Sequence, residues 1–544
     1  MKISKKNRFL TSLASAALVA TAVVAIPTTA QAADPQCATA KFVTQCAGAG
    51  ADGAPYVMIA AANFNGTVFI WSHGIRPAIN IPATLAPVGP YTITNAAEPG
   101  PLTSSGDLSV VNALVAAGYG VAGSGYSRQS LNVTEALNAN VELIGAFKKK
   151  FPTTKKVIAW GNSLGTMHSQ KLVETNPDLV DGLVLACPAA NPSDALVNYF
   201  GDALYGFKAY FDPSIKVGGY STDPATRQAE QLANIGKVLT VLGKLSAGLS
   251  SGAWPDTASP AGKALEKAGI PSRSALLAVG LMAGIPTRSK HVDGTSGPAG
   301  SAETYPLAIA PAVAILENMG TVGVAGSLLL ADGELLAGGK VYDNSKTDYA
   351  ARIASDRDIY SFALSGNTAV DALLGALAAT PRETADAAAV AKIPSLIGLK
   401  GTITKPTVMI AAESDEYTPA SVAQWYVDGY GEQFAAAKDA AIAAAKTSRN
   451  YQAPVNKLVM LWAKTAPKYS KFTATGSPDL SATPGAGTGH CLYTSAQWLA
   501  AAKMIAAAVN TGKFPNQGPI TTAAKKVGLS YDKKFRVPTF KSLA

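Results

Sequence analysis

Short runs of β-branched residues alternate with stretches of helical periodicity between residues 55 and 190, and this alternation constrains the fold more than any other feature. Strands are predicted at residues 68–71, 119–122, 156–160 and 182–186. Apolar residues with helical spacing fill the intervals between them. Strands joined through helices pair in parallel, because the chain must cross one face of the sheet before it returns. The sequence therefore predicts an α/β fold in which a mostly parallel sheet carries helices on both faces.

The pattern stops after the fourth of these strands, and Ala, Gly, Leu and Pro dominate the following segment. Helical runs occur there, the clearest being Leu232, Ile235, Val238, Leu242 and Leu245. An apolar, helical insertion within an α/β domain is typical of a lid, so residues 191–400 are predicted to form a large cap. The rest of the domain would then comprise residues 33–190 and 401–544.

Strand character resumes at residues 407–411. A further strand is predicted at 470–475, and helices at about 433–446 and 495–508. The tail after Thr511 contains Gly, Pro and Lys without periodicity and is expected to lie over the surface.

Residues 1–32 have the pattern of a secretory signal peptide. A basic start is followed by an apolar run and by Ala30-Gln31-Ala32, a small-residue cleavage site. The alternative is a permanent membrane anchor, but Pro27 and the cleavage site favour removal near Ala32. The best later candidate for a membrane span, residues 307–330, contains Glu317 and Asn318. The mature protein is therefore expected to be secreted, without stable membrane insertion.

The composition points to a globular protein and away from nucleic-acid binding. The chain is 48% hydrophobic and 15% charged, far from the composition of disordered proteins. Its formal charge is +10, of which four positive charges lie in the predicted signal peptide (10 − 4 = 6). The remaining Lys and Arg residues are scattered, and the cluster at residues 148–150 ends a predicted helix, where cations complement the helix dipole. No nucleic-acid partner is expected.

Four cysteines, Cys37, Cys46, Cys187 and Cys491, suggest two disulfides in an exported chain. Three pairings are possible. Proximity in the sequence favours Cys37 with Cys46, which would leave Cys187 with Cys491. A zinc site is the weaker alternative, because neither a Cys-x-x-Cys motif nor a paired His spacing accompanies them.

The segment Gly161-Asn162-Ser163-Leu164-Gly165 lies between a predicted strand and a predicted helix. Flanking glycines permit a tight turn that would expose the Ser163 hydroxyl above the sheet, as a serine nucleophile requires. The same pattern recurs at Gly248-Leu249-Ser250-Ser251-Gly252. Ser250 has neither a strand before it nor a helix after it, so Ser163 is the candidate nucleophile.

In chain order, four motifs carry a resemblance to the α/β hydrolase superfamily: Ser72-His73-Gly74-Ile75, Trp160 to Gly165, Glu413-Ser414-Asp415 and Gly489-His490-Cys491. The chain resembles a secreted serine esterase or lipase with a large cap. The resemblance covers the two flanking blocks and not the middle. It implies that the nucleophile is followed by an acid after a late strand and then by a histidine.

The resemblance implies that Asp415 is the acid, because it follows the strand at 407–411 and precedes Thr418-Pro419. Glu413 and Glu416 flank it and are interpreted as solvated turn carboxylates. Asp194, which follows the fourth strand, is the alternative acid. Some members of the superfamily place their acid there.

His490 is the implied base, because it lies in a glycine-rich loop before the last helix, where the superfamily places this residue. His168 lies on the helix that carries the nucleophile and is expected to point elsewhere. His291 lies in the predicted cap and is interpreted as a surface residue.

The backbone N–H groups of Leu164 and Ile75 are the implied donors of an oxyanion hole, with His73 in a structural role. An ordinary strand-end turn is the alternative for residues 73–75. The loop at 123–127 resembles one that lines the pocket in many relatives. A bridge between Cys187 and Cys491 would hold the histidine loop near Ser163, whereas the alternative is two buried, unpaired thiols.

The resemblance implies a hydrolase that cleaves carboxylic esters through an acyl-enzyme on Ser163, without metal or organic cofactor. The apolar cap suggests a bulky or hydrophobic small-molecule or polymeric ester as substrate. A secreted serine peptidase of the same fold would use the same residues. A hydrolase-fold binding protein without activity is the second alternative.

Overall fold

A nine-stranded sheet forms the centre of the protein, described here in a computed structural model. The model describes residues 34–102, 106–189, 193–294, 309–446, 452–474 and 477–538, without the side chains of Ser193 and Asp194. The predicted signal peptide lies outside these residues. The strands are β1 (Gln36–Ala40), β2 (Val43–Ala49), β3 (Pro55–Ala61), β4 (Thr67–Ser72), β5 (Gly120–Ser124), β6 (Lys156–Asn162), β7 (Gly182–Ala186), β8 (Thr407–Ala412) and β9 (Leu458–Ala463).

The strands are arranged in the order β1-β2-β3-β5-β4-β6-β7-β8-β9. The first three pairings are antiparallel, and every pairing from β5 to β9 is parallel. Strands β4, β7, β8 and β9 are buried along their whole length. Such strands read as continuous apolar runs because both faces of a parallel sheet are covered. The predicted α/β class, with its mostly parallel sheet, is confirmed.

Helices cover both faces of the sheet. On one face α1 (Ser109–Ala116), α13 (Ser495–Thr511) and α14 (Gln517–Lys525) form an apolar cluster with the strands. On the other face lie α2 (Val133–Lys150), α3 (Leu164–Thr175) and α12 (Ala420–Ala445). Trp71, Trp160 and Trp498 meet edge to face in the first cluster, with ring centroids 5.2 to 5.9 Å apart.

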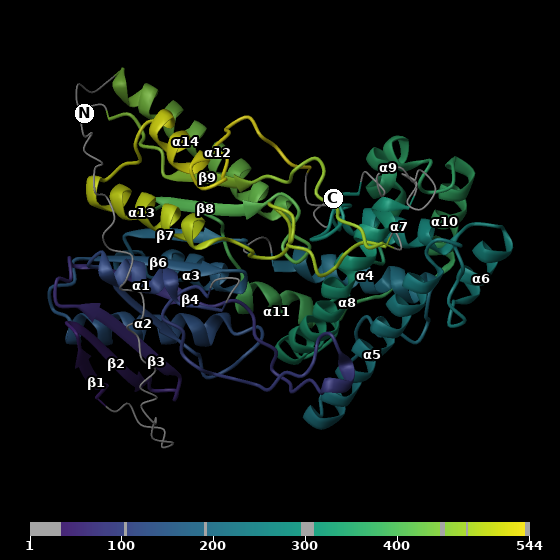
Figure 1. Cartoon of the computed structure of the whole chain (residues 1–544), viewed down its shortest axis with the longest axis horizontal. Helices are drawn as coiled ribbons and strands as arrows, with labels where there is room; N and C mark the ends of the chain where they lie inside the picture. The colour runs from purple at the N-terminus through teal and green to yellow at the C-terminus, as the bar shows by residue number, and fades with distance from the viewer. Residues whose placement is uncertain are drawn as a thin grey trace, which may run out of the picture.

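Eight helices lie between β7 and β8 in the described part of this insertion. They are α4 (Ser193–Tyr210), α5 (Pro224–Gly248), α6 (Pro260–Lys267), α7 (Ser272–Ala283), α8 (Ala310–Ala337), α9 (Tyr349–Tyr360), α10 (Asn367–Ala379) and α11 (Ala387–Ile397). Figure 1 shows them as a separate layer at the end of the sheet toward which β8 points. The helical insertion after the strand now labelled β7 is therefore present, as predicted.

Helix α8 runs through the middle of this cap and packs against α4, α5 and α7. A Cβ atom at Gly280 of α7 would lie 2.3 Å from Cδ1 of Ile315, so glycine is needed for the two helices to approach. Of the described helices, α8 is the one long and apolar enough to cross a membrane, yet 67% of its most apolar stretch is buried inside the protein. Its apolar character is that of a core helix.

Several predicted elements differ from the structure. Residues 470–474 contain only an isolated bridge between Phe472 and Pro478, and the last strand is β9 instead. The helix predicted at 433–446 begins earlier, at Ala420, as α12. The tail predicted to lack periodicity forms α14 and then pairs Ser530 with Trp462. The antiparallel strands β1, β2 and β3 were not predicted, because their runs are short and rich in small residues.

Candidate active site

Ser163 lies at the turn between β6 and α3, in a backbone conformation that few side chains adopt. Its φ is 51° and its ψ is −128°. A Cβ atom at Gly161 would lie 2.4 Å from the carbonyl oxygen of Gly165, and one at Gly165 would lie 2.0 Å from that of Ser72. Both positions therefore require glycine. The chain turns from strand to helix within one residue, which leaves Ser163 at the carboxyl end of the sheet, as a nucleophile elbow does.

Asp415 follows β8 and is 1% exposed. Its Oδ1 atom accepts hydrogen bonds from the backbone N–H groups of Tyr417 (2.8 Å) and Thr418 (2.9 Å). Its Oδ2 atom accepts a third bond from the Thr418 hydroxyl, at 3.2 Å. These three donors fix the carboxylate in one orientation.

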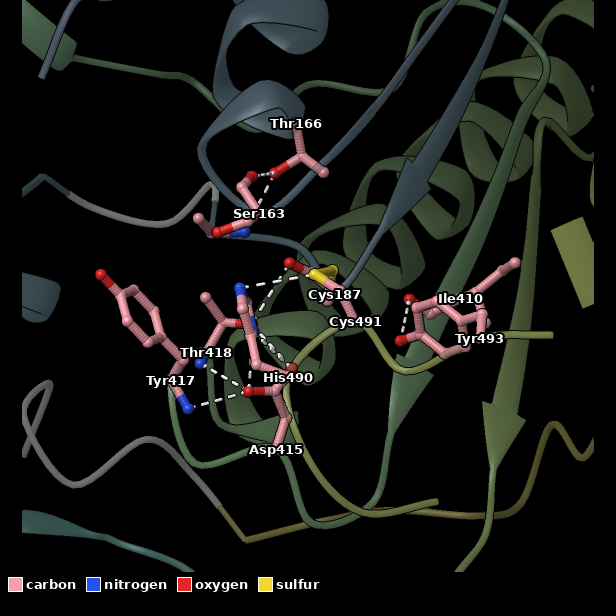
Figure 2. The surroundings of a disulfide bond; sticks show 11 residues. Ser163, Thr166, Cys187, Ile410, Asp415, Tyr417, Thr418, His490, Cys491 and Tyr493 are labelled. Atoms are coloured by element: carbon pink, nitrogen blue, oxygen red, sulfur yellow. Dashed lines mark hydrogen bonds and ion pairs between the residues drawn. A yellow bond between two sulfur atoms is a disulfide. The ribbon is translucent and has the colours of Figure 1, made fainter. Parts of the chain in front are cut away.

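His490 lies against this carboxylate. Its Nδ1 atom lies 3.0 Å from Oδ1 and 2.9 Å from Oδ2 of Asp415, and the Tyr417 ring stacks on the imidazole with centroids 4.7 Å apart. Figure 2 shows His490 between Asp415 and Ser163, with the Nε2 edge of the ring on the Ser163 side. Burial lowers the pKa of His490, but the charge and hydrogen bond of Asp415 outweigh burial and raise that pKa above 6.5.

All four cysteines are paired, Cys37 with Cys46 and Cys187 with Cys491. The second bridge joins the residue that follows β7 to the residue that follows His490, with Cα atoms 5.3 Å apart. Sγ of Cys491 lies 3.4 Å from Nε2 of His490 (Figure 2). Cys187, His490 and Cys491 come close enough together to suggest a metal site. Because the two sulfurs are bonded to each other, neither is a thiolate that could bind one.

Left-handed backbone conformations gather around this point. Ser163 has a φ of 51°, Cys187 of 43°, Gly489 of 73° and Cys491 of 58°. Non-glycine residues with positive φ are uncommon and concentrate at functional sites, where surrounding contacts hold them in place. Three separate loops of the chain are thus held in unusual conformations within the same small region.

The predicted oxyanion donors belong to two segments that meet at Ser163. Leu164 is the first residue of α3, so its N–H belongs to the positive end of a helix dipole. Ile75 follows Gly74, where a Cβ atom would lie 3.2 Å from Cβ of Ser163. The Nδ1–H of His73 donates a 2.6 Å bond to the carbonyl oxygen of Gly74, and His73 is 3% exposed, so it lies within the fold.

His168 is buried on α3, with its ring against that of Tyr126. Its ring meets Tyr126 edge to face at 5.2 Å, and Tyr126 in turn lies 4.6 Å from the His73 ring. Burial, with the charge of Arg76, lowers the pKa of His73 to about 4, and burial lowers the pKa of His168 well below 6.5. Both imidazoles are therefore neutral at ordinary pH.

The other candidates from the sequence lie elsewhere. Ser250 is in the turn after α5, without a strand before it. His291 was interpreted as a surface residue, which is wrong: it is half-buried and bonded to Glu317 at 2.7 Å. Asp194 is the second residue of α4, and its side chain lies outside the described structure.

The two glutamates beside Asp415 are not free turn carboxylates, contrary to their interpretation from sequence: Glu413 is partly buried and Glu416 is buried. Glu413 accepts bonds from the N–H and hydroxyl of Thr465 at 2.8 and 2.9 Å. Glu416 is 2% exposed. The sequence of this turn does not reveal that residues of the cap, such as Tyr199 and Lys290, lie against Glu416.

A small apolar cavity of about 60 Å³ opens beside Ser163. Its described walls include no acidic or basic side chain. They are Ile75, Leu131, Ser163, Leu164, Met167, Ala189, Leu196, Val197, Phe200, Leu329, Leu330, Ile397, Tyr417 and Thr418. The cap helices α4, α8 and α11 supply six of these residues, none of which the sequence identified. No local pattern could have identified them, since their positions converge only through the packing of the cap.

Comparison with known proteins supports the fold. A family profile described as serine aminopeptidase, S33, matches residues 109–258, the segment that contains Ser163. No curated protein sequence matches the chain.

Several solved structures are similar to the chain at low identity. Candida antarctica lipase A is 12% identical, covering 92% of this chain and 88% of its own, with a TM-score of 0.35. Feruloyl esterase B from Aspergillus oryzae is 14% identical over 88% and 83%, with a TM-score of 0.34. The rice cell wall degrading esterase LipA from Xanthomonas oryzae is 13% identical over 78% and 83%, with a TM-score of 0.29. Likenesses this distant carry no information about substrate.

The fold and the profile agree where they overlap. The profile spans α1 to α5 and therefore includes β5 and β6, the two neighbours of β4, and β7, which pairs with β6. Within that span the chain turns sharply at Ser163, between β6 and α3. By its mostly parallel sheet and its strand-to-helix elbow at Ser163, the chain has the architecture of an α/β hydrolase fold.

Proposed function

We propose that the protein is a secreted serine hydrolase that cleaves carboxylic esters with Ser163 as nucleophile, His490 as base and Asp415 as the acid that orients the base. The observation that carries the proposal is the bond between Asp415 and Nδ1 of His490, which leaves Nε2 on the Ser163 side of the ring. This is the order of groups that an acyl transfer through serine requires.

In the proposed reaction, Nε2 of His490 takes the proton from Oγ of Ser163 as Oγ bonds to the ester carbonyl carbon. The carbonyl oxygen becomes an oxyanion, which the N–H groups of Leu164 and Ile75 stabilise. The bond to the alcohol oxygen then breaks, and the imidazolium protonates this oxygen. Water attacks the acyl-enzyme by the same route, with His490 again accepting a proton, and releases the carboxylic acid and Ser163.

The cavity beside Ser163 favours an apolar group next to the ester carbonyl. Its described walls are aliphatic and aromatic apart from Ser163 and Thr418, so a charged group would be buried there without a partner. At about 60 Å³ it is far smaller than the roughly 300 Å³ of an ordinary ligand pocket. A bulky substrate therefore needs the cap helices to move outward.

A fluorophosphonate probe tests the catalytic proposal. We expect it to label the wild-type protein on Ser163 and not to label Ser163→Ala. Ser250→Ala is the matched control, because it removes the serine of the second Gly-x-Ser-x-Gly pattern and should be labelled as the wild type is. Equal labelling of wild type and Ser163→Ala, or no labelling of either, would contradict the proposal and favour a binding protein without activity.

The description of the matching profile favours a peptidase as second candidate. An aminopeptidase must hold a free substrate amine, which calls for a carboxylate near the nucleophile. The described cavity walls supply none. Nitrophenyl esters of increasing acyl length, compared with amino-acid anilides, separate the two activities. Faster turnover of the anilides would replace the esterase proposal with the peptidase.

Secretion is part of the proposal and rests on the N-terminal pattern together with the two disulfides. Mass spectrometry of protein recovered from the medium or the cell envelope should give a mature N-terminus near Ala33. Recovery of the intact N-terminus from the cytoplasm would contradict it.

A further inference from the structure

Glu416 is a buried carboxylate beside the proposed acid that the proposed reaction does not use. Its side chain is 3% exposed, and its Oε2 atom has no hydrogen-bond partner among the described residues. Its backbone carbonyl accepts a 2.6 Å bond from the Tyr199 hydroxyl of the cap helix α4. A buried carboxylate without a full set of partners is costly, which suggests that it has a function at this position.

Among the described residues, two basic side chains interact with Glu416, namely His490 and Lys290. The Nζ atom of Lys290 lies 3.8 Å from Oε1 of Glu416. Lys290 belongs to residues 286–293, the segment that leaves α7, here called the α7 tail. The Lys290 carbonyl accepts a 2.8 Å bond from the N–H of Gly485, in the loop that leads to His490. Lys290 therefore touches the acid loop with its side chain and the histidine loop with its backbone.

The α7 tail makes further contacts with the same two loops. The carbonyl of Arg288 accepts a 2.8 Å bond from the Ser414 hydroxyl, which is next to Asp415. The Tyr469 hydroxyl donates a 2.6 Å bond to the carbonyl of Ser289. A Cβ atom at Gly489 would lie 2.9 Å from Cγ of Lys290, so the stem of this lysine packs against the residue before His490. A segment of the cap thus fixes both loops of the proposed triad.

We propose that Lys290 and Glu416 form a charge pair through which the α7 tail positions His490 and sets the pH at which the enzyme becomes active. The inference rests on the proposed function, since it assigns the two residues a role in adjusting the proposed base. Neither residue touches the substrate or the reacting atoms. They are positioning residues that act through His490.

The charges around His490 have opposite effects. Asp415 and Glu416 raise its pKa because a negative charge favours the imidazolium, whereas Lys290 lowers it. The groups that face Glu416 itself are Asp415, Lys290, His490 and the Tyr199 phenol. Burial and the Asp415 charge raise the pKa of Glu416, and Lys290 opposes them. The charges of Lys290 and Glu416 thus act on His490 in opposite directions, and each partly offsets the other.

The test is the pH dependence of kcat/KM for a nitrophenyl ester. This quantity rises with pH as the imidazole loses its proton, so its midpoint reports the pKa of the base in the free enzyme. Glu416→Gln removes a negative charge near the imidazolium, and we expect the midpoint to fall. Lys290→Met removes a positive charge and keeps an aliphatic stem, and we expect the midpoint to rise. Each shift should be about half a pH unit.

Matched control variants distinguish a local charge effect on His490 from the effect of changing the net charge of the protein. Glu266→Gln and Lys149→Met remove the same charges from exposed positions on α6 and α2 and should leave the midpoint unchanged. Lys290→Arg keeps the positive charge and should keep the wild-type midpoint. If Glu416→Gln does not fold, the comparison of Lys290→Met with Lys290→Arg still decides the question.

Two results would overturn the inference: midpoints that equal the wild type in both variants, or shifts in the same direction. Either would mean that the pair only supports packing. These results are distinguishable from failure of the proposed function, because they require an active enzyme. Turnover that persists in Ser163→Ala would instead remove the proposed function.

Discussion

The disulfide between Cys187 and Cys491 joins the end of β7 to the residue after His490, across a sequence separation of 304. The two loops it connects come from opposite sides of the cap insertion, so the bridge closes a ring that contains the whole cap. Asp415 and His490 both lie in the second part of this ring, whereas Ser163 precedes it. The bridge therefore connects the end of β7, which pairs with the strand β6 that precedes Ser163, to the loop of the proposed base.

We expect the Cys187→Ala/Cys491→Ala variant to lose activity out of proportion to its stability. By restricting the unfolded chain, a bridge across this separation should raise the free energy of unfolding by about 6 kcal/mol in a chain-entropy model. Its larger effect should be on kcat, by tenfold or more at about 25 °C, because Cys491 holds His490 in place. Cys37→Ala/Cys46→Ala is the control, since that bridge joins the exposed strand β1 to β2 and should leave kcat unchanged. Equal losses in the two variants would show that the bridge matters only for stability.

Asp415→Asn should lower kcat/KM by about 10² to 10⁴, because an amide can present its N–H group to Nδ1 and so favour the wrong tautomer of His490. Without the Asp415 charge the pKa of His490 falls, so the acid limb of the residual activity should move to lower pH. Asp194→Asn, which changes the alternative acid, should retain wild-type kinetics. If Asp194→Asn is the more damaging change, the acid has been assigned to the wrong residue.

The sequence predicted the parallel part of the fold because that part follows local rules. Runs such as those of β4, β7 and β8 are apolar throughout, and the residues between them have helical spacing. The elbow was equally local, since both glycines beside Ser163 are required by contacts within a few residues of it and with Ser72. Strand β9 was not predicted, although it too is an apolar run that is buried along its whole length.

The surroundings of the site could not be predicted in the same way. Phe200, Leu330 and Ile397 meet beside Ser163 only because α4, α8 and α11 pack together, and no spacing along the chain encodes this. Lys290 reads in the sequence as an ordinary surface cation, yet the α7 tail carries it to Glu416. Contacts between residues far apart in the sequence can be identified only from the folded structure.

His168→Phe should make the protein more resistant to acid. His168 is buried, with its pKa held well below 6.5, so the unfolded chain binds a proton more readily than the folded one as pH falls below 6.5. Stability is therefore lost from about pH 6.5 downward. For His73, whose folded pKa is about 4, the loss approaches about 3 kcal/mol below pH 4. Phenylalanine keeps the edge-to-face contact with Tyr126 but cannot be protonated.

The measurement is the Tm of wild type and His168→Phe at about pH 5 and pH 7.5. We expect a smaller difference between the two pH values in the variant. His291→Phe serves as the comparison, because His291 is bonded to Glu317 and does not share the buried, unpartnered environment of His168. An unchanged pH dependence in His168→Phe would mean that His168 takes up its proton in the folded state.

Asp332 of α8 connects the cap to the loop before α2, and its removal should loosen the cap. It forms an ion pair with Arg128 and accepts a 2.9 Å bond from the N–H of Leu131, with 8% of its side chain exposed. Leu131 and Leu330 both line the cavity beside Ser163. Asp332→Asn leaves Arg128 without its anionic partner, which should cost about 1 to 3 kcal/mol. Hydrogen exchange should therefore increase in α8 and the loop before α2, while the sheet strands stay protected.

A looser cap should also lower KM for long-chain esters more than for acetate esters, because the cavity must widen to admit them. Exchange that is unchanged in α8, or that increases equally throughout the sheet, would show that this ion pair does not hold the cap in place.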